Sequence, residues 1–408
     1  MLVNKNRDMT PFDMNKPPRK QKWYLMPLIW GGSFIMTRQF GLKIQKKNME
    51  HFKPPYLVIS THQGFSDYYI TPLALFPHRA NYVSDMEGFA AFGEWLYRAI
   101  GCIGKRRYVP DITVVKNMKQ ALDKGQSVVV YPESRHCNVG TTSYIPSNMG
   151  KLVKMMEVPV VILTAHGSYL ANPFWDEEHT RKVPMEATLE GVYTAEEVAT
   201  LSADQIQQSI EKKLQYDEYA WQQSQKIKIT YKNRAEGLHK ALYQCRACAE
   251  EFSMKSSGSR LWCERCGAQW QLTEQGYLQG VEDNTSIHIP HWYEWQRKNV
   301  QREAGQGDFT LTFRVRVEAL PNAKGFVELG EGVLTMDKQR FILKMEGVEE
   351  IFFPHHTRES VQTEYNYRGK GMAIVLSTKD CCYYIYSNDK HFNPTKLQFV
   401  GEYFYPRG

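Results

Sequence analysis

The chain has 408 residues, of which 42% are hydrophobic and 23% are charged, a composition typical of a globular protein. This length is more than one compact core usually holds, so we expect roughly two to four domains. No run reaches about 18 unbroken apolar residues, which excludes an evident membrane span, and the polar first 22 residues do not resemble a secretory signal. Eight cysteines with two C-x-x-C pairs suit a reducing cytosol better than a disulfide framework.

The basic charge is confined to the N-terminus. Residues 1–53 hold eleven Lys or Arg against three Asp or Glu, a net charge of +8, while the whole chain carries +7. This local excess predicts an anionic partner for the N-terminus. We expect an anionic membrane surface there, and no nucleic acid bound along the protein.

Inside this basic segment lies an apolar stretch, WYLMPLIWGGSFIM, residues 23–36, which Pro27, Gly31 and Gly32 interrupt. It is too short to span a bilayer but suits an interfacial helix. A buried core helix is the alternative interpretation. Because the basic flanks favour membrane contact, we expect residues 1–53 to form a basic arm with helices that lie at the membrane.

Residues 54–192 alternate short β-branched runs with helical segments, the pattern of an α/β domain with a largely parallel sheet flanked by helices. A helix is predicted over residues 111–125, with Asp111 as its N-cap and Gly125 just past its end. The expected buried strands are YLVIS (56–60), SVVVY (127–131) and PVVIL (159–163).

The C-terminal part of the chain has a β pattern. TLTFRVRV, residues 310–317, alternates strictly, and further short strands follow before a helical pattern at the end. Antiparallel strands closed by a C-terminal helix resemble a pleckstrin-homology (PH) or GRAM-like barrel, so we expect a β domain of that kind over residues 300–408. Between the two parts, residues 193–240 predict a polar helical extension with a capping box at 202–205.

The stretch THQGFSDYY, residues 61–69, places His62 and Asp67 five residues apart, directly after an expected strand. On one continuous helix, two side chains at this spacing diverge by about 140°. They meet only if His62 lies in the turn that leaves the strand and Asp67 lies in the first turn of the next helix. The carboxylate then holds one imidazole nitrogen and leaves the other free as a general base for a substrate hydroxyl.

Three further blocks follow the His–Asp block in order. They are GCIGKRR at 101–107, YPESRH at 131–136 and VPVV at 158–161. Together the four blocks resemble the glycerolipid acyltransferase family, which includes the lysophosphatidate acyltransferases, over roughly residues 23–192. The resemblance implies an α/β acyltransferase core in which His62 takes the proton of the acceptor hydroxyl and Asp67 orients His62.

The resemblance also implies a set of substrate-binding residues. Arg107 matches the arginine of the second block and would bind the acceptor phosphate, with Lys105 and Arg106 sharing that task. Glu133 matches the glutamate of the third block and would position the glycerol part of the acceptor. The family reads E-G-T-R there, whereas this sequence reads ESRH, so either a residue is deleted or the positions after the glutamate are substituted. We expect Arg135 to bind substrate as well, and the departure bears on the identity of the acceptor more than on the reaction.

Two cysteine pairs, CRAC at 245–248 and CERCG at 263–267, have the spacing C-x2-C-x14-C-x2-C. Two such knuckles make a tetrahedral four-thiolate site, so we expect a zinc ribbon over residues 241–284. Four thiolates leave no open coordination position, so the zinc would be structural, and no cofactor is expected for the chemistry. Charges balance over 241–280, which argues against a nucleic-acid-binding ribbon. The expected ligands are Cys245, Cys248, Cys263 and Cys266.

These observations predict an acyltransferase of phospholipid synthesis, cytoplasmic and peripheral at the inner face of the membrane. The donor would be acyl-CoA or acyl carrier protein, and the favoured acceptor is the sn-2 hydroxyl of 1-acyl-glycerol-3-phosphate, lysophosphatidate. Glycerol 3-phosphate or another lysophospholipid is the alternative acceptor. The rival interpretation is a non-catalytic lipid- or protein-binding protein with the same fold, which binding without turnover would support.

Overall fold

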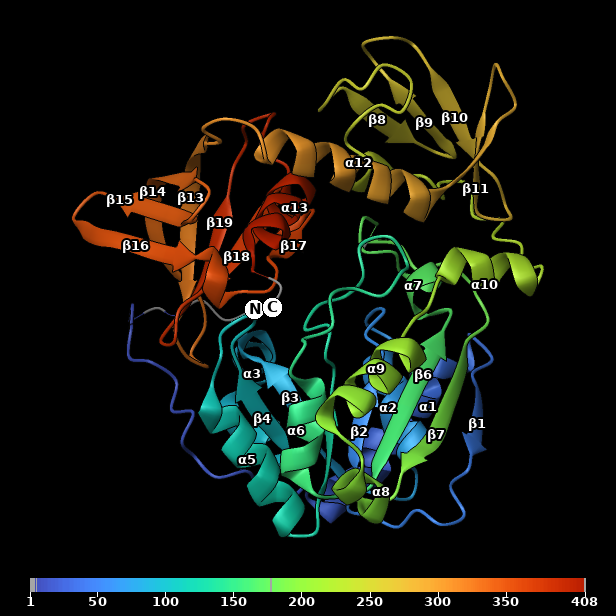
Figure 1. Cartoon of the computed structure of the whole chain (residues 1–408), viewed down its shortest axis with the longest axis vertical. Coiled ribbons are helices and arrows are strands. Elements are labelled where there is room, and N and C mark those ends of the chain that lie inside the picture. Colours follow the sequence, from blue (N-terminus) through green and yellow to red (C-terminus); the bar gives the residue numbers. More distant parts are fainter. Residues whose placement is uncertain (1–3, 5, 177, 407–408) are drawn as a thin grey trace.

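The computed structural model describes residues 4, 6–176 and 178–406. Figure 1 shows an α/β core in the lower half, a small β module beside the long helix α12 (Ile289–Ala304) at the top, and a second β domain at the upper left. Among the described residues, no helix combines the length and the apolar character needed to cross a membrane.

The core is a seven-stranded sheet in the order β1-β7-β6-β2-β5-β3-β4. Neighbouring strands run parallel, except that β7 is antiparallel to β6. The predicted largely parallel sheet is therefore confirmed, and the three β-branched runs form its strands β2, β5 and β6. The strands are β1 Lys43–Lys47, β2 Leu57–Ser60, β3 Ala80–Asp85, β4 Cys102–Lys105, β5 Ser127–Val130, β6 Val160–His166 and β7 Glu186–Tyr193.

Helices cover both faces of this sheet, because alternate residues of a strand face opposite sides. Leu57 and Ile59 of β2 pack in one apolar cluster with α5, α6 and α9, whereas Val58 packs in the cluster that contains α2. Helix α1 packs beside α2. The helical segments of this half are η1 Trp23–Leu25, α1 Met26–Arg38, α2 Asp67–Leu75, α3 Met86–Phe92, α4 Glu94–Ala99, α5 Ile112–Asp123, α6 Met149–Met156, α7 Ser168–Ala171, α8 Ala195–Thr200, α9 Ala203–Lys213, α10 Glu218–Ser224 and α11 Leu238–Ala241.

Two helix signals read from the sequence are confirmed. Asp111 caps α5 by accepting a hydrogen bond from the backbone N–H of Thr113 at 2.8 Å, and Gly125 follows the helix with φ near +73°. Ser202 and Gln205 form the predicted reciprocal capping box at the start of α9.

The two cysteine pairs lie in a module of five antiparallel strands, which we call the cysteine module. Its sheet has the order β12-β11-β10-β9-β8, and α12 leads from it into the C-terminal domain. The strands are β8 Met254–Ser257, β9 Arg260–Cys263, β10 Gln269–Leu272, β11 Tyr277–Gly280 and β12 Ser286–His288.

The C-terminal domain is an antiparallel sheet in the order β16-β15-β14-β13-β19-β18-β17, with α13 packed against it. The predicted alternation in β13 is confirmed, because Phe313, Val315 and Val317 are buried. Among the described strands, β16 and β17 remain separate edges, so the sheet is a half-barrel, and the finer PH or GRAM-like assignment is not confirmed. The elements are β13 Leu311–Leu320, β14 Val327–Met336, β15 Arg340–Met345, β16 Val348–Pro354, η2 His355–Thr357, β17 Gln362–Glu364, η3 Tyr367–Gly369, β18 Ala373–Ser377, β19 Cys382–Tyr386 and α13 Pro394–Phe404.

The basic arm ahead of α1 is docked along the protein. Phe12 is buried, and its backbone N–H donates to the carbonyl of Pro321 in the C-terminal domain at 2.9 Å. The N–H of Lys22 donates to the carbonyl of Ala99 in the core at 3.0 Å. The arm therefore connects the C-terminal domain to the α/β core.

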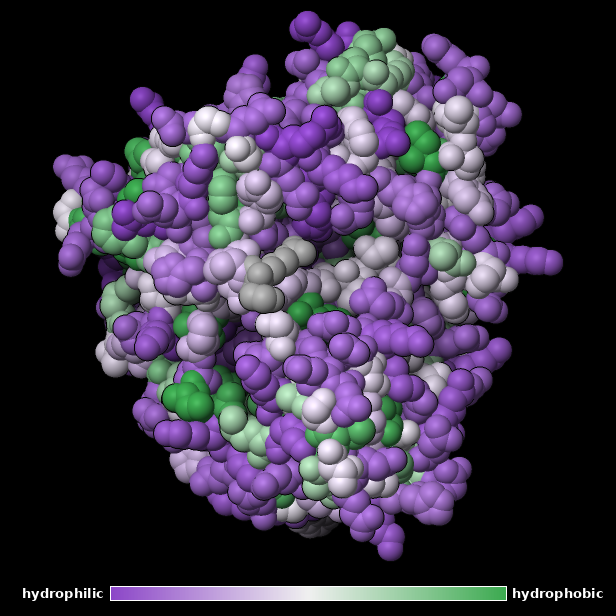
Figure 2. Space-filling view, in the orientation of Figure 1, coloured by the Kyte–Doolittle hydropathy of each residue, from purple (hydrophilic) through white to green (hydrophobic). Residues whose placement is uncertain are grey.

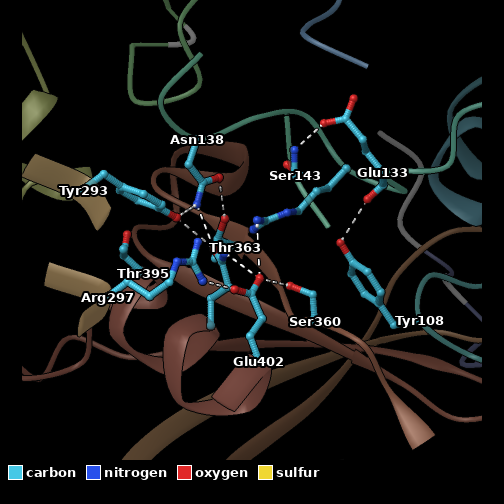
Figure 3. Close-up of polar contacts among 12 residues, drawn as sticks. Tyr108, Glu133, Asn138, Ser143, Tyr293, Arg297, Ser360, Thr363, Thr395 and Glu402 are labelled. Atoms are coloured by element: carbon cyan, nitrogen blue, oxygen red, sulfur yellow. Dashed lines mark hydrogen bonds and ion pairs between the residues drawn. The ribbon is translucent and has the colours of Figure 1, made fainter. Parts of the chain in front are cut away.

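The C-terminal domain and the core also share one apolar cluster, which includes Phe174 of the core, Trp292 of α12 and Phe399 of α13. Polar contacts reinforce this junction in Figure 3, where Asn138 points toward Tyr293. The amide nitrogen of Asn138 donates to the hydroxyl of Tyr293 at 2.9 Å. The C-terminal domain is thus packed against the α/β core.

Candidate active site

His62 and Asp67 meet as their spacing predicted. His62 lies in the turn between β2 and α2, and Asp67 is the first residue of α2. The imidazole Nδ1 lies 3.2 Å from the carboxylate Oδ2 of Asp67, and the two residues are only 6% and 2% exposed. Burial on this scale shields the pair from water and makes its electrostatic coupling stronger than at a surface.

The carboxylate of Asp67 is fixed by the backbone of the same turn. Its Oδ2 accepts from the N–H of Gln63 at 2.6 Å and from the N–H of Gly64 at 3.0 Å. These donors, together with the start of α2, favour a negative charge at this position. A fixed carboxylate holds the Nδ1 side of His62 and leaves Nε2 as the nitrogen that can exchange a proton.

Glu133 lies behind His62 and does not line the cavity. One carboxylate oxygen accepts from the backbone N–H of His62 at 2.9 Å. The other accepts from the N–H of Ser143 at 2.7 Å and from the hydroxyl of Tyr216 at 3.0 Å. Burial raises the pKa of Glu133, against the effect of these donors. In this structure Glu133 holds the backbone of His62 and of the following loop, and its expected contact with the acceptor stays a prediction.

A cavity of about 290 Å³ opens at His62. Its long wall is apolar and is formed by side chains of α5 and α6, including Val114, Met118, Met149 and Leu152. Its polar end lies where β3 and β4 finish, at the carboxyl edge of the parallel strands, the usual ligand-binding edge of such sheets. The charged residues that line it are Asp85, Lys105, Arg107, Asp111 and Glu359.

Two of the predicted cations reach this cavity, Lys105 and Arg107. The ammonium of Lys105 donates to the hydroxyl of Ser134 at 2.7 Å, and burial lowers the pKa of Lys105. Arg107 forms an ion pair with Asp85, and its other terminal nitrogen lies 3.4 Å from Glu87. Burial would lower the pKa of Arg107, but these carboxylates raise it well above its ordinary value. Arg107 is therefore charged and already paired.

Arg106 and Arg135 do not reach the cavity. Arg106 donates to the backbone carbonyls of Lys379 and Asp380 at 2.6 and 2.9 Å, so it fastens the second block to the C-terminal domain. Arg135 is buried, with its guanidinium 3.5 Å from a carboxylate oxygen of Glu402 in α13. Figure 3 shows Glu402 at this junction. Both arginines are thus held by the C-terminal domain, and their expected substrate contacts stay predictions.

Sequence reasoning did not identify the rings around His62. Its imidazole lies 4.5 Å from the ring of Tyr131 and 4.4 Å from that of His136. Burial lowers the pKa of His136 well below its ordinary value, so this imidazole is neutral. The sequence did mark the position of His136 as unusual. His136 is the third residue after Glu133, where the family motif E-G-T-R has its arginine.

The C-terminal domain supplies part of the cavity wall, which no sequence motif indicated. His356, Thr357, Glu359 and Tyr405 line the cavity together with His62. Tyr384 of this domain also donates from its hydroxyl to Glu87 at 2.6 Å, behind Arg107. The C-terminal domain is thus part of the candidate active site.

The four predicted metal ligands converge in the cysteine module. Their sulfur atoms all lie within 4.8 Å of one another. Two S–S distances, Cys245 to Cys266 and Cys248 to Cys263, are 3.7 and 3.9 Å. Zinc–sulfur bonds of about 2.3 Å in a tetrahedron place the sulfurs ~3.8 Å apart, so this donor set fits a zinc ion.

Large apolar side chains are exposed at the N-terminal helices. Leu28 and Ile35 of α1 are 75% and 70% exposed, and Trp23, Tyr24 and Phe34 are exposed as well. The buried-core interpretation of residues 23–36 is therefore wrong. The face of the molecule in Figure 2 is mainly hydrophilic, with apolar residues in small separate groups.

Comparison with known proteins agrees with the four-block pattern. Residues 43–165 match the family model described as Acyltransferase, which confirms the resemblance over that segment. A 1-acyl-sn-glycerophosphate (LPA) acyltransferase, PlsC, from Thermotoga maritima is similar at 14% identity over 47% of this chain and 77% of its own, with a TM-score of 0.40. SsgB of Streptomyces coelicolor, from work on mutations that correlate to longitudinal cell division during sporulation, is similar at 12% identity over 24% of this chain and 86% of its own, with a TM-score of 0.15. No curated protein matches the chain significantly.

Proposed function

We propose that this protein transfers a fatty acyl group from a thioester to a hydroxyl of a glycerolipid, with His62 as the general base. The observation that carries the proposal is the His62–Asp67 pair at the edge of a cavity with an apolar wall. The pair supports proton transfer, and the wall suits an alkyl chain. The family match over residues 43–165 supports the same reaction class.

His62 acts twice in the proposed reaction. Its Nε2 accepts the proton of the acceptor hydroxyl while the hydroxyl oxygen attacks the thioester carbonyl carbon. The carbon–sulfur bond then breaks, and the imidazolium returns the proton to the departing thiolate. Asp67 stabilises the imidazolium and keeps the ring in one orientation, and the contact of Glu133 with the backbone of His62 supports the same geometry.

The acceptor supplies the nucleophile, so no covalent acyl-enzyme is needed. Cys137 lies beside the turn; it is fully buried, and its sulfur is 3.5 Å from the carbonyl of Gln63. Burial raises the pKa of its thiol well above the ordinary value. A thiol in this state is a poor nucleophile, because the thiolate is the reactive form.

A lysophospholipid is the acceptor class that we propose, with phospholipid synthesis as the process. Lys105 and Arg107 lie at the polar end of the cavity, where a phosphate group of the acceptor would lie. The family resemblance favours lysophosphatidate and its sn-2 hydroxyl, with glycerol 3-phosphate as the alternative. Acyl-CoA and acyl carrier protein are the proposed donors, since both carry the acyl group as a thioester.

We propose that the protein acts at the surface of an anionic membrane. Met36 of α1 and Phe65 of the His62 turn line one shared cavity of about 220 Å³, so the exposed apolar face of α1 adjoins the active site. Lys or Arg residues near an anionic bilayer each contribute about 1 kcal/mol of binding. Insertion of α1 at the interface would bring His62 near an acceptor whose acyl chain stays in the membrane.

We propose a structural role for zinc. It would be held by the four cysteines of the cysteine module and would supply no chemistry to the reaction, since four thiolates fill its coordination. The module packs into the large apolar cluster through Cys245 and Trp270. Metal binding would therefore stabilise the junction between the core and α12.

The experiment that tests the proposal is a product analysis. Purified protein is mixed with acyl-CoA or acyl carrier protein donors and a panel of lysophospholipids and glycerol 3-phosphate, and mass spectrometry identifies the products. Release of free thiol together with new diacyl products from the lysophospholipids, or a monoacyl product from glycerol 3-phosphate, supports an enzyme. Binding of lipids without product supports the rival, a non-catalytic binding protein.

A further inference from the structure

The polar end of the active-site cavity is not a cationic pocket. Among the described residues, Lys105 and Arg107 are the two Lys or Arg side chains that line it, against three carboxylates, those of Asp85, Asp111 and Glu359. The lining therefore has a formal net charge of −1 with histidines neutral. A phosphate monoester carries ~1.5 to 2 negative charges at neutral pH and is poorly matched to such a lining.

The guanidinium of Arg107 is already occupied. One terminal nitrogen is paired with Asp85, and the other lies 3.4 Å from Glu87 and 3.9 Å from Glu364. A phosphate that bound Arg107 through both nitrogens would have to displace these carboxylates. The position where the family has a further arginine holds His136, a neutral imidazole. Lys105 is thus the cation of the lining that is not held in an ion pair by a described residue.

Glu359 brings a negative charge to the same end from the C-terminal domain. It lines the cavity just beyond η2, and among the described residues its carboxylate has neither a hydrogen bond nor an ion pair within 4.0 Å. Burial raises the pKa of Glu359, and the nearby charge of Lys105 lowers it. The rings of Tyr108 and Tyr405 line the cavity close to Glu359. A carboxylate beside aromatic rings is the environment that binds an ammonium group.

We infer that the acceptor is a zwitterionic lysophospholipid, whose phosphodiester binds Lys105 and whose ammonium group binds Glu359 beside Tyr108 and Tyr405. This inference rests on the proposed acyl transfer and specifies the acceptor. A phosphodiester carries one negative charge and the ammonium one positive charge, so the head group is neutral overall. It matches one free cation and one free carboxylate without displacing the partners of Arg107. Glu359 is then a specificity-determining residue supplied by the C-terminal domain.

The test is a competition assay with three acceptors that share one acyl chain. Lysophosphatidylethanolamine has a phosphodiester and an ammonium, lysophosphatidylglycerol has a phosphodiester alone, and lysophosphatidate has a phosphate monoester. With an acyl-CoA donor, mass spectrometry gives the ratio of the three products. We expect the wild type to prefer lysophosphatidylethanolamine at least tenfold over each of the others. Equal use of lysophosphatidylglycerol, or a preference for lysophosphatidate, would overturn the inference.

Two variants test the residue itself. Glu359→Gln should lower the preference for lysophosphatidylethanolamine by about tenfold or more, since it removes a charge-assisted contact. Glu359→Lys should shift the preference toward lysophosphatidate. Glu349→Gln, at an exposed position of β16 in the same domain, should keep the wild-type ratio.

The outcomes separate the two proposals. If both Glu359 variants give the product ratios of the wild type, the role of Glu359 is overturned. The preference of the wild type for lysophosphatidylethanolamine is tested separately, because that measurement needs no variant. If none of the three acceptors is acylated, the proposed acyl transfer to a lysophospholipid is overturned instead.

Discussion

Arg107 and Asp85 form an ion pair at the polar end of the cavity, so the arginine of the second block is held by the protein itself. Asp85 also caps α3 by accepting from the N–H of Gly88. Arg107 therefore keeps its positive charge but is not available to bind a ligand. The charge and the availability can be tested separately.

Replacing Asp85 by Asn should release Arg107 for an anionic ligand. Asn caps helices as well as Asp does, so the fold should be retained. We expect the use of lysophosphatidate relative to lysophosphatidylethanolamine to rise about tenfold, the effect of one freed charge-assisted hydrogen bond of ~1.5 kcal/mol. The competition assay measures the ratio. Asp123→Asn, at an exposed end of α5, is the control, and the same ratio in both variants would contradict this assignment.

Glu402 should make the junction between the domains sensitive to acid. Its carboxylate pairs with Arg297 and lies 3.5 Å from Arg135. Burial raises its pKa, but the two arginines more than reverse this effect, and the net shift is downward. A carboxyl whose pKa is lower in the folded state stabilises the fold above its unfolded pKa. This contribution is lost as the pH falls through the folded pKa.

Glu402→Gln should therefore lower the melting temperature most at neutral pH. Breaking a buried ion pair costs about 3–5 kcal/mol, because the remaining charge is left without its partner. Thermal unfolding from pH 7 down to about pH 3, below the ordinary pKa of a glutamate, checks this, with Glu349→Gln as the exposed control. We expect the gap between wild type and Glu402→Gln to narrow at the acid end. A gap that is the same at both pH values would refute the ionic role of Glu402.

Metal analysis should find about one zinc per chain. Cys263→Ser removes one of the four thiolates and should release the metal and lower the melting temperature, since metal binding and local folding are coupled. Cys381→Ser changes a buried cysteine outside the module and should keep the zinc. A folded wild type that binds no zinc would contradict the assignment.

The exposed apolar residues of α1 should bind membranes. We expect the wild type to float with vesicles rich in anionic lipid and to detach as salt rises, since screening weakens the basic contribution. Leu28→Ser with Ile35→Ser, seven residues apart on one helix face, should lower binding without lowering the melting temperature, because both side chains are exposed. Unchanged flotation of this double variant would count against membrane binding through α1.

Neutralising the basic arm is a separate test. Lys16 is not a free cation, since its ammonium lies 2.7 Å from Glu94 of α4. Arg19, Lys20 and Lys22 are exposed. Replacing these three by Gln should lower vesicle binding and turnover on vesicle-borne acceptor, and turnover on a short-chain soluble acceptor should change much less. Identical flotation across a salt series would show that the arm does not bind the membrane.

The sequence predicted those features that depend on local patterns. The β-branched runs gave the strands β2, β5 and β6. The turn after β2 could be reasoned to bring His62 to Asp67, because both lie within one strand–turn–helix unit. The cysteine spacing gave the four-sulfur cluster for the same reason, since each pair lies in its own short turn.

The remaining features depend on contacts between distant parts of the chain. Arg106 and Arg135 carry the charge and the spacing of phosphate ligands, but their partners lie more than 200 residues away in the C-terminal domain. The carboxylate that holds Arg107 ends another strand, and Glu359 enters the cavity from another domain. No motif encodes such partners, because tertiary packing alone determines which side chain a buried charge meets.

The most direct test of the central claim is the rate of acyl transfer by His62→Ala. Purified wild type should release free thiol from acyl-CoA in step with the formation of diacyl product. His62→Ala should lower kcat by about 10²–10⁴-fold, the usual effect of removing a general base. His51→Ala, an exposed histidine ahead of β2, should leave kcat unchanged. Activity within about threefold of wild type, in His62→Ala protein with an unaltered melting temperature, would contradict the account.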